Sequence, residues 1–312
     1  MPARSCFRRG MPAREGFMIL EQLAGNLFQG VVLGTVYGMA TMGLSLIFGV
    51  LKVVNVGHGA FIMVGAFTSF AVFEYLGLSP VFAIPVAFGI GMVLGMIFYY
   101  TSIRSLLKGP ELASLLATFS FGVILEEGIK FFFTSDFRGF NWDLGKIDME
   151  FTVLPYAKVA ACLGSVVIAV LLYLWFNKTR AGMAMRSVVE DGVGARVCGV
   201  NVDWEYALSF SLGIGLTVAS GVLLTMFVSV GINPYMGGEY TLKAFVIAVL
   251  GGLASPYGAF FGGLVFGLLE NGSYTLFAQI DGLEPFAMTR FFSFLILLLI
   301  LLLRPTGILK AK

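Results

Sequence analysis

A series of long apolar runs restricts the folds open to this chain more than any other feature. The runs cover residues 27–51, 58–77, 80–101, 112–133, 157–176, 205–230, 238–254, 256–276 and 290–303. As helices, runs of this length cross the hydrocarbon core of a bilayer, and they are far longer than barrel strands. A helix is stable in lipid because it satisfies its own backbone hydrogen bonds. The pattern predicts an all-α, polytopic membrane helical bundle with interrupted helices and about nine spans, within a range of about eight to ten.

The overall composition supports a membrane protein and excludes several other classes. Hydrophobic residues make up 58% of the 312 residues, and charged residues make up 12%. A soluble domain cannot bury that much apolar surface, whereas a bilayer is itself an apolar solvent. The net charge of +2 gives no reason to expect nucleic acid as a partner. Cys6, Cys162 and Cys198 lie far apart, so their spacing predicts neither a disulfide framework nor a metal site.

Basic residues gather in a few connecting segments and predict the orientation of the bundle. Arg104 and Lys108 share one short loop, and further cations lie within residues 177–204 and 304–312. Because Lys and Arg are enriched in cytoplasmic loops, we expect all of these segments in the cytoplasm. The polar loop 134–156 then faces the periplasm. The run 27–51 is long enough to contain a break.

The N-terminal residues 1–17 do not fit this orientation. They carry Arg4, Arg8, Arg9 and Arg14 and have no apolar run of their own. If the runs alternate sides, these cations lie outside the cell, which is the wrong side for their charge. We therefore expect residues 1–17 to be a disordered tail or a non-native start, with residues 18–312 as the membrane domain. The alternative is a further helix within 17–51.

The segment 177–204, here called the island, is charged and lies between two apolar runs. Ser187 and Glu190 fit a helix N-cap with its capping-box partner, and Gly199 fits the residue that ends a helix. Valines at helical spacing between them predict a helix over about residues 188–198 with one apolar face. Such a helix is suited to dock on a soluble partner. An ordinary helical loop in the cytoplasm is the alternative.

Glycine spacing predicts how the helices pack. Gly30, Gly34 and Gly38 recur every four residues, and other runs repeat this spacing. The spacing lets helix backbones approach closely in lipid, so bundle packing explains most of the glycines. The segments 54–60 and 249–259 instead resemble interrupted helices. Their freed backbone groups are tolerated only when buried in protein or lining a wet cavity.

Few titratable residues lie within the apolar runs. His58, the only histidine, has no neighbouring metal ligand, and we interpret it as a structural residue beside a backbone break. Lys243 and Glu270 mark a polar path or a subunit contact, with snorkelling to the interface as the alternative for Lys243. Glu126 and Lys130 have the spacing of an i,i+4 ion pair.

No sequence motif supplies energy or catalytic chemistry. The chain has no Gly-x-x-x-x-Gly-Lys-Ser/Thr phosphate loop, and Gly145-Lys146-Ile147 fails at the glycine spacing and at the hydroxyl position. No nucleophile stands beside a base in a recognisable pattern. The sequence therefore predicts a protein that is not an enzyme, has no cofactor of its own and depends on a partner for energy.

Several motifs occur in a fixed order along the chain. They are SLIFGVLKVVNVGHGAFIMVGAF (45–67), RSVVEDGVGARVCGVN (186–201), INPYMGGEYTLKAFVIAVLGGLASPYGAFFGGLVFG (232–267) and RPTGIL (304–309). Together they resemble the permeases of the branched-chain amino acid ABC importer family, most closely the shorter of its two permease types. The resemblance implies a multi-pass subunit of the bacterial inner membrane. It also implies a second homologous permease, two cytoplasmic ATPase subunits that bind ATP and Mg, and a periplasmic substrate-binding protein. Because loop 134–156 is the longest polar stretch on the periplasmic side and carries mixed charges, we expect it to help dock that protein, with a solvated loop as the alternative.

The resemblance gives a role to the island, and the two interruptions predict a translocation path. The island corresponds to the segment that couples the permease to the ATPase, with Arg186, Val189, Glu190, Asp191, Val193, Arg196 and Gly199 at the contact. We expect the translocation path to pass both interruptions, beside Tyr37, Asn55, Gly57, His58, Gly59, Asn233, Gly251 and Gly252. Relatives commonly carry Glu where this chain has Ala60. We therefore expect no fixed ammonium site there, which favours a neutral or anionic solute.

Two other classes of protein stay open at this point. A secondary transporter or channel for a small solute needs coupling charges within its spans, and here such charges are few. An intramembrane enzyme needs a catalytic constellation, and none is visible in the sequence. Co-purification with an ATPase would separate an importer from both.

Overall fold

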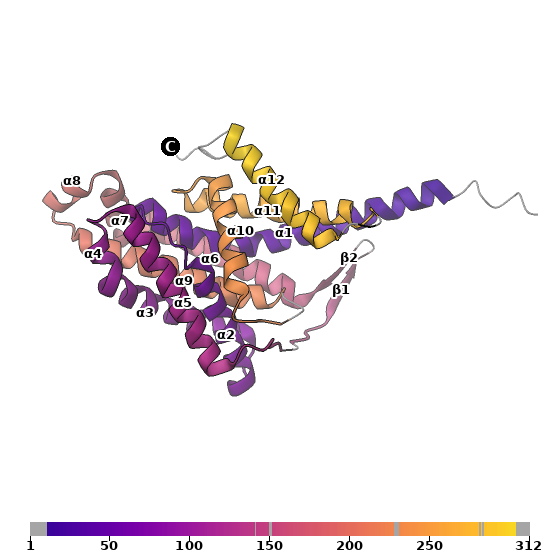
Figure 1. Cartoon of the computed structure of the whole chain (residues 1–312), viewed down its shortest axis with the longest axis horizontal. Helices are drawn as coiled ribbons and strands as arrows, with labels where there is room; N and C mark the ends of the chain where they lie inside the picture. Colours follow the sequence, from indigo (N-terminus) through magenta and orange to yellow (C-terminus); the bar gives the residue numbers. More distant parts are fainter. Residues whose placement is uncertain are drawn as a thin grey trace, which may run out of the picture.

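The computed structural model describes residues 11–140, 142–149, 152–227, 231–280, 282 and 284–303. Its described part is a bundle of long helices with one small β-hairpin (Figure 1). The prediction of a helical polytopic bundle is confirmed. Residues 1–10 of the basic segment lie outside the described residues, as do the C-terminal cations and the RPTGIL motif.

The helices follow the apolar runs of the sequence closely. In chain order they are α1 (Met11–Leu51), α2 (His58–Leu76), α3 (Pro80–Phe98), the π-helical turn η1 (Tyr99–Ile103), α4 (Arg104–Leu106), α5 (Glu111–Phe133), α6 (Tyr156–Lys178), α7 (Arg180–Glu190), α8 (Gly192–Val197), α9 (Val202–Thr225), α10 (Met236–Gly251), α11 (Pro256–Phe277) and α12 (Pro285–Leu303). Strands β1 (Lys146–Met149) and β2 (Thr152–Pro155) lie between α5 and α6. Each apolar run coincides with one long helix.

The number of membrane crossings differs from the expected count. Among the described residues, six helices are long and apolar enough to cross a membrane. The pair α10 and α11 is bent by 112° and forms a broken span or a re-entrant loop, which brings the count to at most seven. The apolar part of α12, Pro285–Ile300, is shorter. The count of about nine is therefore not confirmed, because apolar length alone does not show whether a helix crosses or turns back.

Helix α1 is continuous, so the expected break within 27–51 is absent. The same helix includes residues 11–17 of the expected tail, and no further helix is inserted within 17–51. It ends where Lys52 adopts a left-handed φ of 59°. The glycines of α1 serve packing instead, since a Cβ on Gly34 would lie 2.8 Å from the carbonyl oxygen of Gly263 on α11.

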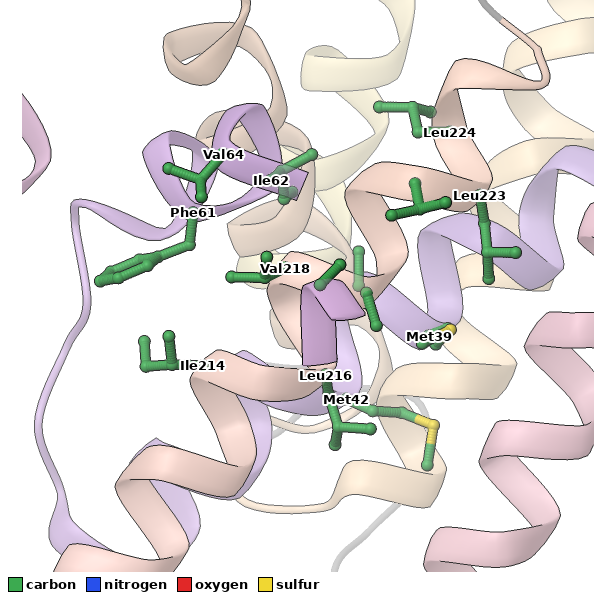
Figure 2. Close-up of a cluster of buried hydrophobic side chains, with 14 of the residues drawn as sticks. Met39, Met42, Phe61, Ile62, Val64, Ile214, Leu216, Val218, Leu223 and Leu224 are labelled. Carbon is green, nitrogen blue, oxygen red and sulfur yellow. The ribbon is translucent and has the colours of Figure 1, made fainter. Parts of the chain in front are cut away.

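The core lies where α1, α2 and α9 meet. Figure 2 shows Met39, Phe61 and Val218 among the side chains that fill the space between these helices, and all three are fully buried. Helices α2 and α9 approach so closely that a Cβ on Gly65 would collide with the Val218 carbonyl. In lipid, such close backbone packing holds helices together without a hydrophobic driving force.

The two ends of the bundle carry different small elements. Figure 1 places α7 and α8 at one end, and the β1–β2 hairpin at the opposite end. The strands pair antiparallel, with Lys146 opposite Pro155 and Met149 opposite Thr152. The all-α prediction missed this hairpin. Apolar and polar residues alternate along the stretch, a pattern that is typical of strands.

Candidate functional site

A cavity of about 780 Å³ opens among α1, α10, α11 and α12, near the hairpin end of the bundle. Helical spacing explains its lining. Asn26, Gln29, Leu33 and Tyr37 recur every three or four residues and so share one face of α1. Helices α10 to α12 add the charged residues Glu239, Lys243, Glu270 and Arg290. The cavity therefore combines an apolar setting with several ionised groups.

Lys243 is the centre of a charge network in this cavity. Its Nζ lies 2.8 Å from Glu270 Oε1 and 3.2 Å from Glu239 Oε1, and it donates a hydrogen bond to the Tyr37 hydroxyl at 3.1 Å. Arg290 extends the network, with its Nη2 2.9 Å from Glu239 Oε2. The Lys243 side chain is only 11% exposed, and its ammonium points into this network. A cation with so little access to water is stabilised by its paired carboxylates.

Aromatic side chains border one side of the cavity. The Tyr37 ring meets Phe266 edge-on at 5.9 Å and Tyr240 at 6.5 Å. The Lys243 ammonium lies 5.2 Å from the centre of the Tyr37 ring. Just beyond, a Cβ on Gly38 would lie 2.5 Å from the Phe260 carbonyl oxygen, so the backbones of α1 and α11 touch. These ring and backbone contacts border the cavity on the side of Tyr37.

Two polar atoms in the cavity have no hydrogen-bond partner among the described residues. They are Glu270 Oε2 and Thr289 Oγ1, and both are buried. Buried polar groups in proteins are nearly always satisfied, so unsatisfied ones need an explanation. Both atoms are covered by protein, so a solute in the cavity reaches them only after the side chains turn.

The structure separates the residues expected along the translocation path. Tyr37 and Asn233 line the cavity. Asn55, Gly57, His58 and Gly59 lie instead in or beside the α1–α2 connection, and Gly251 and Gly252 lie at the α10–α11 turn. None of these six residues is among those that line the cavity. Their role in a path stays a prediction.

The α1–α2 connection is sealed by hydrogen bonds to neighbouring helices. Thr118 accepts from the Val56 amide at 3.1 Å, and Thr241 accepts from the Gly59 amide at 2.8 Å. His58 is fully buried, with Nδ1 3.5 Å from the Thr217 hydroxyl. Ala60 is also buried, 3.7 Å from a Cβ placed on Gly122 of α5. Position 60 therefore faces packed helices rather than the cavity.

The island forms two helices where the sequence predicts one over residues 188–198. Helix α7 begins after Thr179, whose hydroxyl accepts from the Gly182 amide at 3.1 Å. The chain bends at Asp191, whose carboxylate caps α8 by accepting from the Val193 amide at 2.9 Å. Ser187 is no N-cap, because its hydroxyl donates to the Ala184 carbonyl within α7.

The end of the island helix is predicted correctly. Gly199 has a φ of 86°, a left-handed conformation that suits glycine. The amides of Gly199 and Val200 donate to the carbonyls of Arg196 and Ala195, both at 3.0 Å, which is the Schellman pattern.

The valines of the island divide between a buried and an exposed set. Val188 packs with Ala195 of α8 and Val202 of α9. Val193 and Val197 are 77% and 85% exposed, one turn apart on α8. Glu190, Asp191 and Arg196 are also exposed. Val189, on α7, is also exposed, at 44%, so the apolar face packs within the island in part and leaves three valines at the surface.

Other sequence expectations can be placed directly. Lys130 lies 2.8 Å from both Glu126 and Glu127, so the expected i,i+4 pair is confirmed and a second carboxylate joins it. Sequence reasoning missed three charged residues of the cavity, which are Lys158, Glu239 and Arg290. Glu239 and Lys243 stand four residues apart on one helix, a spacing that signals an ion pair.

These features define a class: a polytopic helical membrane protein whose bundle holds a charged cavity, with no energy-supplying motif in its sequence. The family model described as "Branched-chain amino acid transport system / permease component" matches residues 26–301. The chain belongs to this family of transport permeases. It is a transport subunit and not an enzyme.

Individual relatives agree with this assignment. The chain is 29% identical over 300 residues to the high-affinity branched-chain amino acid transport system permease protein LivH of Salmonella typhimurium, covering 91% of this chain and 94% of the relative. It is 28% identical to the permease protein BraD of Pseudomonas aeruginosa, with the same coverage. It is 26% identical to a probable LivH of Methanocaldococcus jannaschii, covering 86% of this chain and 87% of that protein. PsaBC from Streptococcus pneumoniae in complex with Fab reaches a TM-score of 0.45 at 17% identity, covering 89% and 90% of the two chains.

Proposed function

We propose that this chain is the permease subunit of an ATP-driven, binding-protein-dependent importer for branched-chain amino acids or related small polar solutes. It acts in the bacterial inner membrane beside a second homologous permease. Two cytoplasmic ATPase subunits bind ATP and Mg, and this chain carries no cofactor. The family match and the names of the relatives support the importer class and the solute class.

The orientation of the bundle follows from its charges. Lys178, Arg180, Arg186 and Arg196 lie at the island end, which is therefore cytoplasmic. The hairpin end, with residues 134–156, then faces the periplasm. Its mixed charges suit the docking of a periplasmic binding protein, because such charges steer encounter and orientation. The cavity lies near this end and can receive a solute from the docked protein.

The charged cavity is the observation that carries the proposal. An amino acid brings an ammonium and a carboxylate into an apolar bundle, and each must find a partner there. Glu270 and Thr289 line the cavity and can accept from an ammonium once their side chains turn towards it, while Lys243 and Arg290 can meet a carboxylate. Leu33, Phe227 and other apolar groups of the lining suit an aliphatic side chain. The absence of a carboxylate at position 60 favoured a neutral or anionic solute. The cavity instead supplies partners for both charged groups of an amino acid.

The island supports coupling to an ATPase. Its exposed valines on α8 and the exposed charges of Glu190, Asp191 and Arg196 offer a small amphipathic surface at the cytoplasmic end. Contacts of this kind place an apolar centre within a polar rim. Because Val188 and Ala195 also pack against α9, movement of the island reaches the membrane helices.

The experiment reconstitutes the permease with its ATPase subunits, second permease and binding protein in vesicles, and measures ATP-dependent uptake of L-leucine. Glu270→Gln removes the carboxylate but keeps the volume, and should lower uptake by on the order of tenfold, since charge-assisted bonds are the strong ones. Glu126→Gln is the matched control, because Glu126 pairs with Lys130 outside the cavity, and should transport normally. Equal uptake by both variants would contradict a role for the cavity.

A secondary transporter is the second candidate, and one observation favours it. The Lys243–Glu270 pair is an intramembrane ion pair of the kind that can couple solute to ions. The same vesicles separate the two functions. Uptake that follows an ion gradient and needs no ATP would select the secondary transporter.

A further inference from the structure

One cation of the cavity takes no part in its charge network. Lys243, Glu239, Glu270 and Arg290 are joined in a chain of ion pairs. Lys158, at the start of α6, also lines the cavity, but no carboxylate lies within 4.0 Å of it among the described residues. The paired charges cancel, so Lys158 leaves the described lining with one surplus positive charge.

Lys158 is held in place by neutral partners. Its Nζ donates to Gln29 Oε1 at 3.2 Å, and the Gln29 amide in turn donates to Thr152 Oγ1 on β2 at 2.9 Å. The ammonium also lies 5.7 Å from the centre of the Phe227 ring. An ammonium has three donors, and Lys158 uses one of them for its hydrogen bond to Gln29, so donors remain for a ligand. The side chain is positioned, and no carboxylate of the described residues neutralises its charge.

Lys158 and Lys243 lie at different depths of the cavity. Each contacts α1, Lys158 at Gln29 and Lys243 at Tyr37. These positions are eight residues apart, which is about 12 Å along a helix that rises about 1.5 Å per residue. The Gln29–Thr152 contact puts Lys158 near the hairpin end, while Lys243 contacts Tyr37 about two turns further along α1. The α-ammonium and α-carboxylate of one amino acid are too close together to reach both depths at once.

We infer that Lys158 captures the carboxylate of the incoming solute at the outer part of the cavity, and so selects solutes that carry one. This inference rests on the proposed function. A carboxylate bound there meets an unpaired cation in a partly desolvated setting, where a charge-assisted hydrogen bond is strong. The solute then moves inward to the Lys243–Glu270 pair. Lys158 is thus a specificity-determining residue, distinct in depth from the Lys243–Glu270 pair.

The first test measures the charge preference of the cavity without any transport. In a background with Cys6, Cys162 and Cys198 changed to Ser, Leu33→Cys places a thiol between the two depths. The purified permease reacts with a methanethiosulfonate that bears either a sulfonate or a trimethylammonium group. The quantity compared is the reaction rate with the anionic sulfonate reagent divided by the rate with the cationic trimethylammonium reagent. Lys158→Gln should lower this ratio by on the order of tenfold, because one nearby positive charge is removed. Lys158→Arg should keep the ratio.

The control is Lys146→Gln, which removes an exposed lysine already paired with Asp148 on β1. It should leave the ratio unchanged. An unchanged ratio in Lys158→Gln would overturn the inference. So would a thiol at position 33 that reacts with neither reagent, because the cavity would then be closed to solutes.

The second test measures L-leucine uptake in the reconstituted importer. Lys158→Gln should raise KM about fivefold or more with little change in kcat, since a capture residue acts before the rate-limiting change. Lys158→Arg should restore KM. A fall in kcat at unchanged KM would indicate a merely structural lysine and overturn the inference. If the wild-type complex shows no ATP-dependent uptake, the proposed function fails, while the labelling ratios still decide whether Lys158 attracts anions.

Discussion

Helix α1 borders two regions that treat polar groups in opposite ways. Towards α2 and α9, the hydroxyls of Thr41 and Thr217 donate to carbonyls of their own helices, at 2.9 and 2.8 Å. Towards the cavity, polar groups reach across helices, as Asn26 does to Thr275 and Lys243 does to Tyr37. Most hydroxyls of the first region, here called the dry region, are satisfied within their own helix, which suits close packing; Ser69–Thr225 and Thr217–His58 are polar contacts between its helices. Partners on separate helices can be exchanged for a solute, so the second region is suited to transport.

The largest effect is expected from breaking the charge network in the cavity. Lys243→Met leaves Glu270 and Glu239 without their shared cation, and removing one partner of a buried pair costs about 3–5 kcal/mol. The thermal unfolding midpoint of the purified permease should fall accordingly. Lys243→Met combined with Glu270→Gln should recover part of the loss. No recovery in the double variant would show that the pair does not act as a unit.

An intermediate effect is expected in the dry region. Gly65→Ala places a methyl group against the Val218 carbonyl, and overpacking of a filled interior costs about 1–3 kcal/mol. The exposed Gly89 on α3 is the matched control, since a Cβ there meets nothing within 4 Å. Unfolding midpoints should separate the two alanine variants. If they unfold alike, the close contact of α2 and α9 does not govern stability.

The smallest effect on stability is expected on the island, which belongs to neither region. Replacing Val193 and Val197 by Ser should change the unfolding free energy by less than about 0.5 kcal/mol, because both side chains are exposed. ATP-driven uptake should nevertheless fall, because the ATPase loses an apolar contact. Val188→Ser is the buried comparison and should lower stability. A double variant with normal uptake would remove these valines from the coupling surface.

The dry region was the more predictable of the two from sequence. Apolar length gives the helices, and the spacing of Gly30, Gly34 and Gly38 gives the close contact with α11, since both follow from local chemistry. The cavity depends on how α1, α10, α11 and α12 are rotated about one another. Glu270 of α11 reaches Lys243 of α10 because the two helices are bent by 112° relative to each other. The glycine-rich pattern at 249–259 predicts an interruption there, but no local pattern gives its angle or the side chains that it brings together.

The island shows why helix ends are hard to predict. Ser187, Thr179 and Asp191 are all good N-cap residues, and a capping pattern alone does not choose among them. The choice follows from backbone conformation, which lets the Asp191 carboxylate reach the Val193 amide. Gly199 was the exception. A residue with a left-handed backbone conformation at the end of a helix is usually glycine, so the sequence predicts this helix end correctly.

Helix α9 connects the island to the wall of the cavity. Its first turn holds Val202 in the small cluster with Val188 and Ala195, and its last turn brings Leu224 to the cavity wall. At 24 residues it is about 36 Å long and, being hydrogen-bonded throughout, stiff along its axis. If the island couples to an ATPase as proposed, a stiff α9 would transmit its displacement to the cavity wall with little loss.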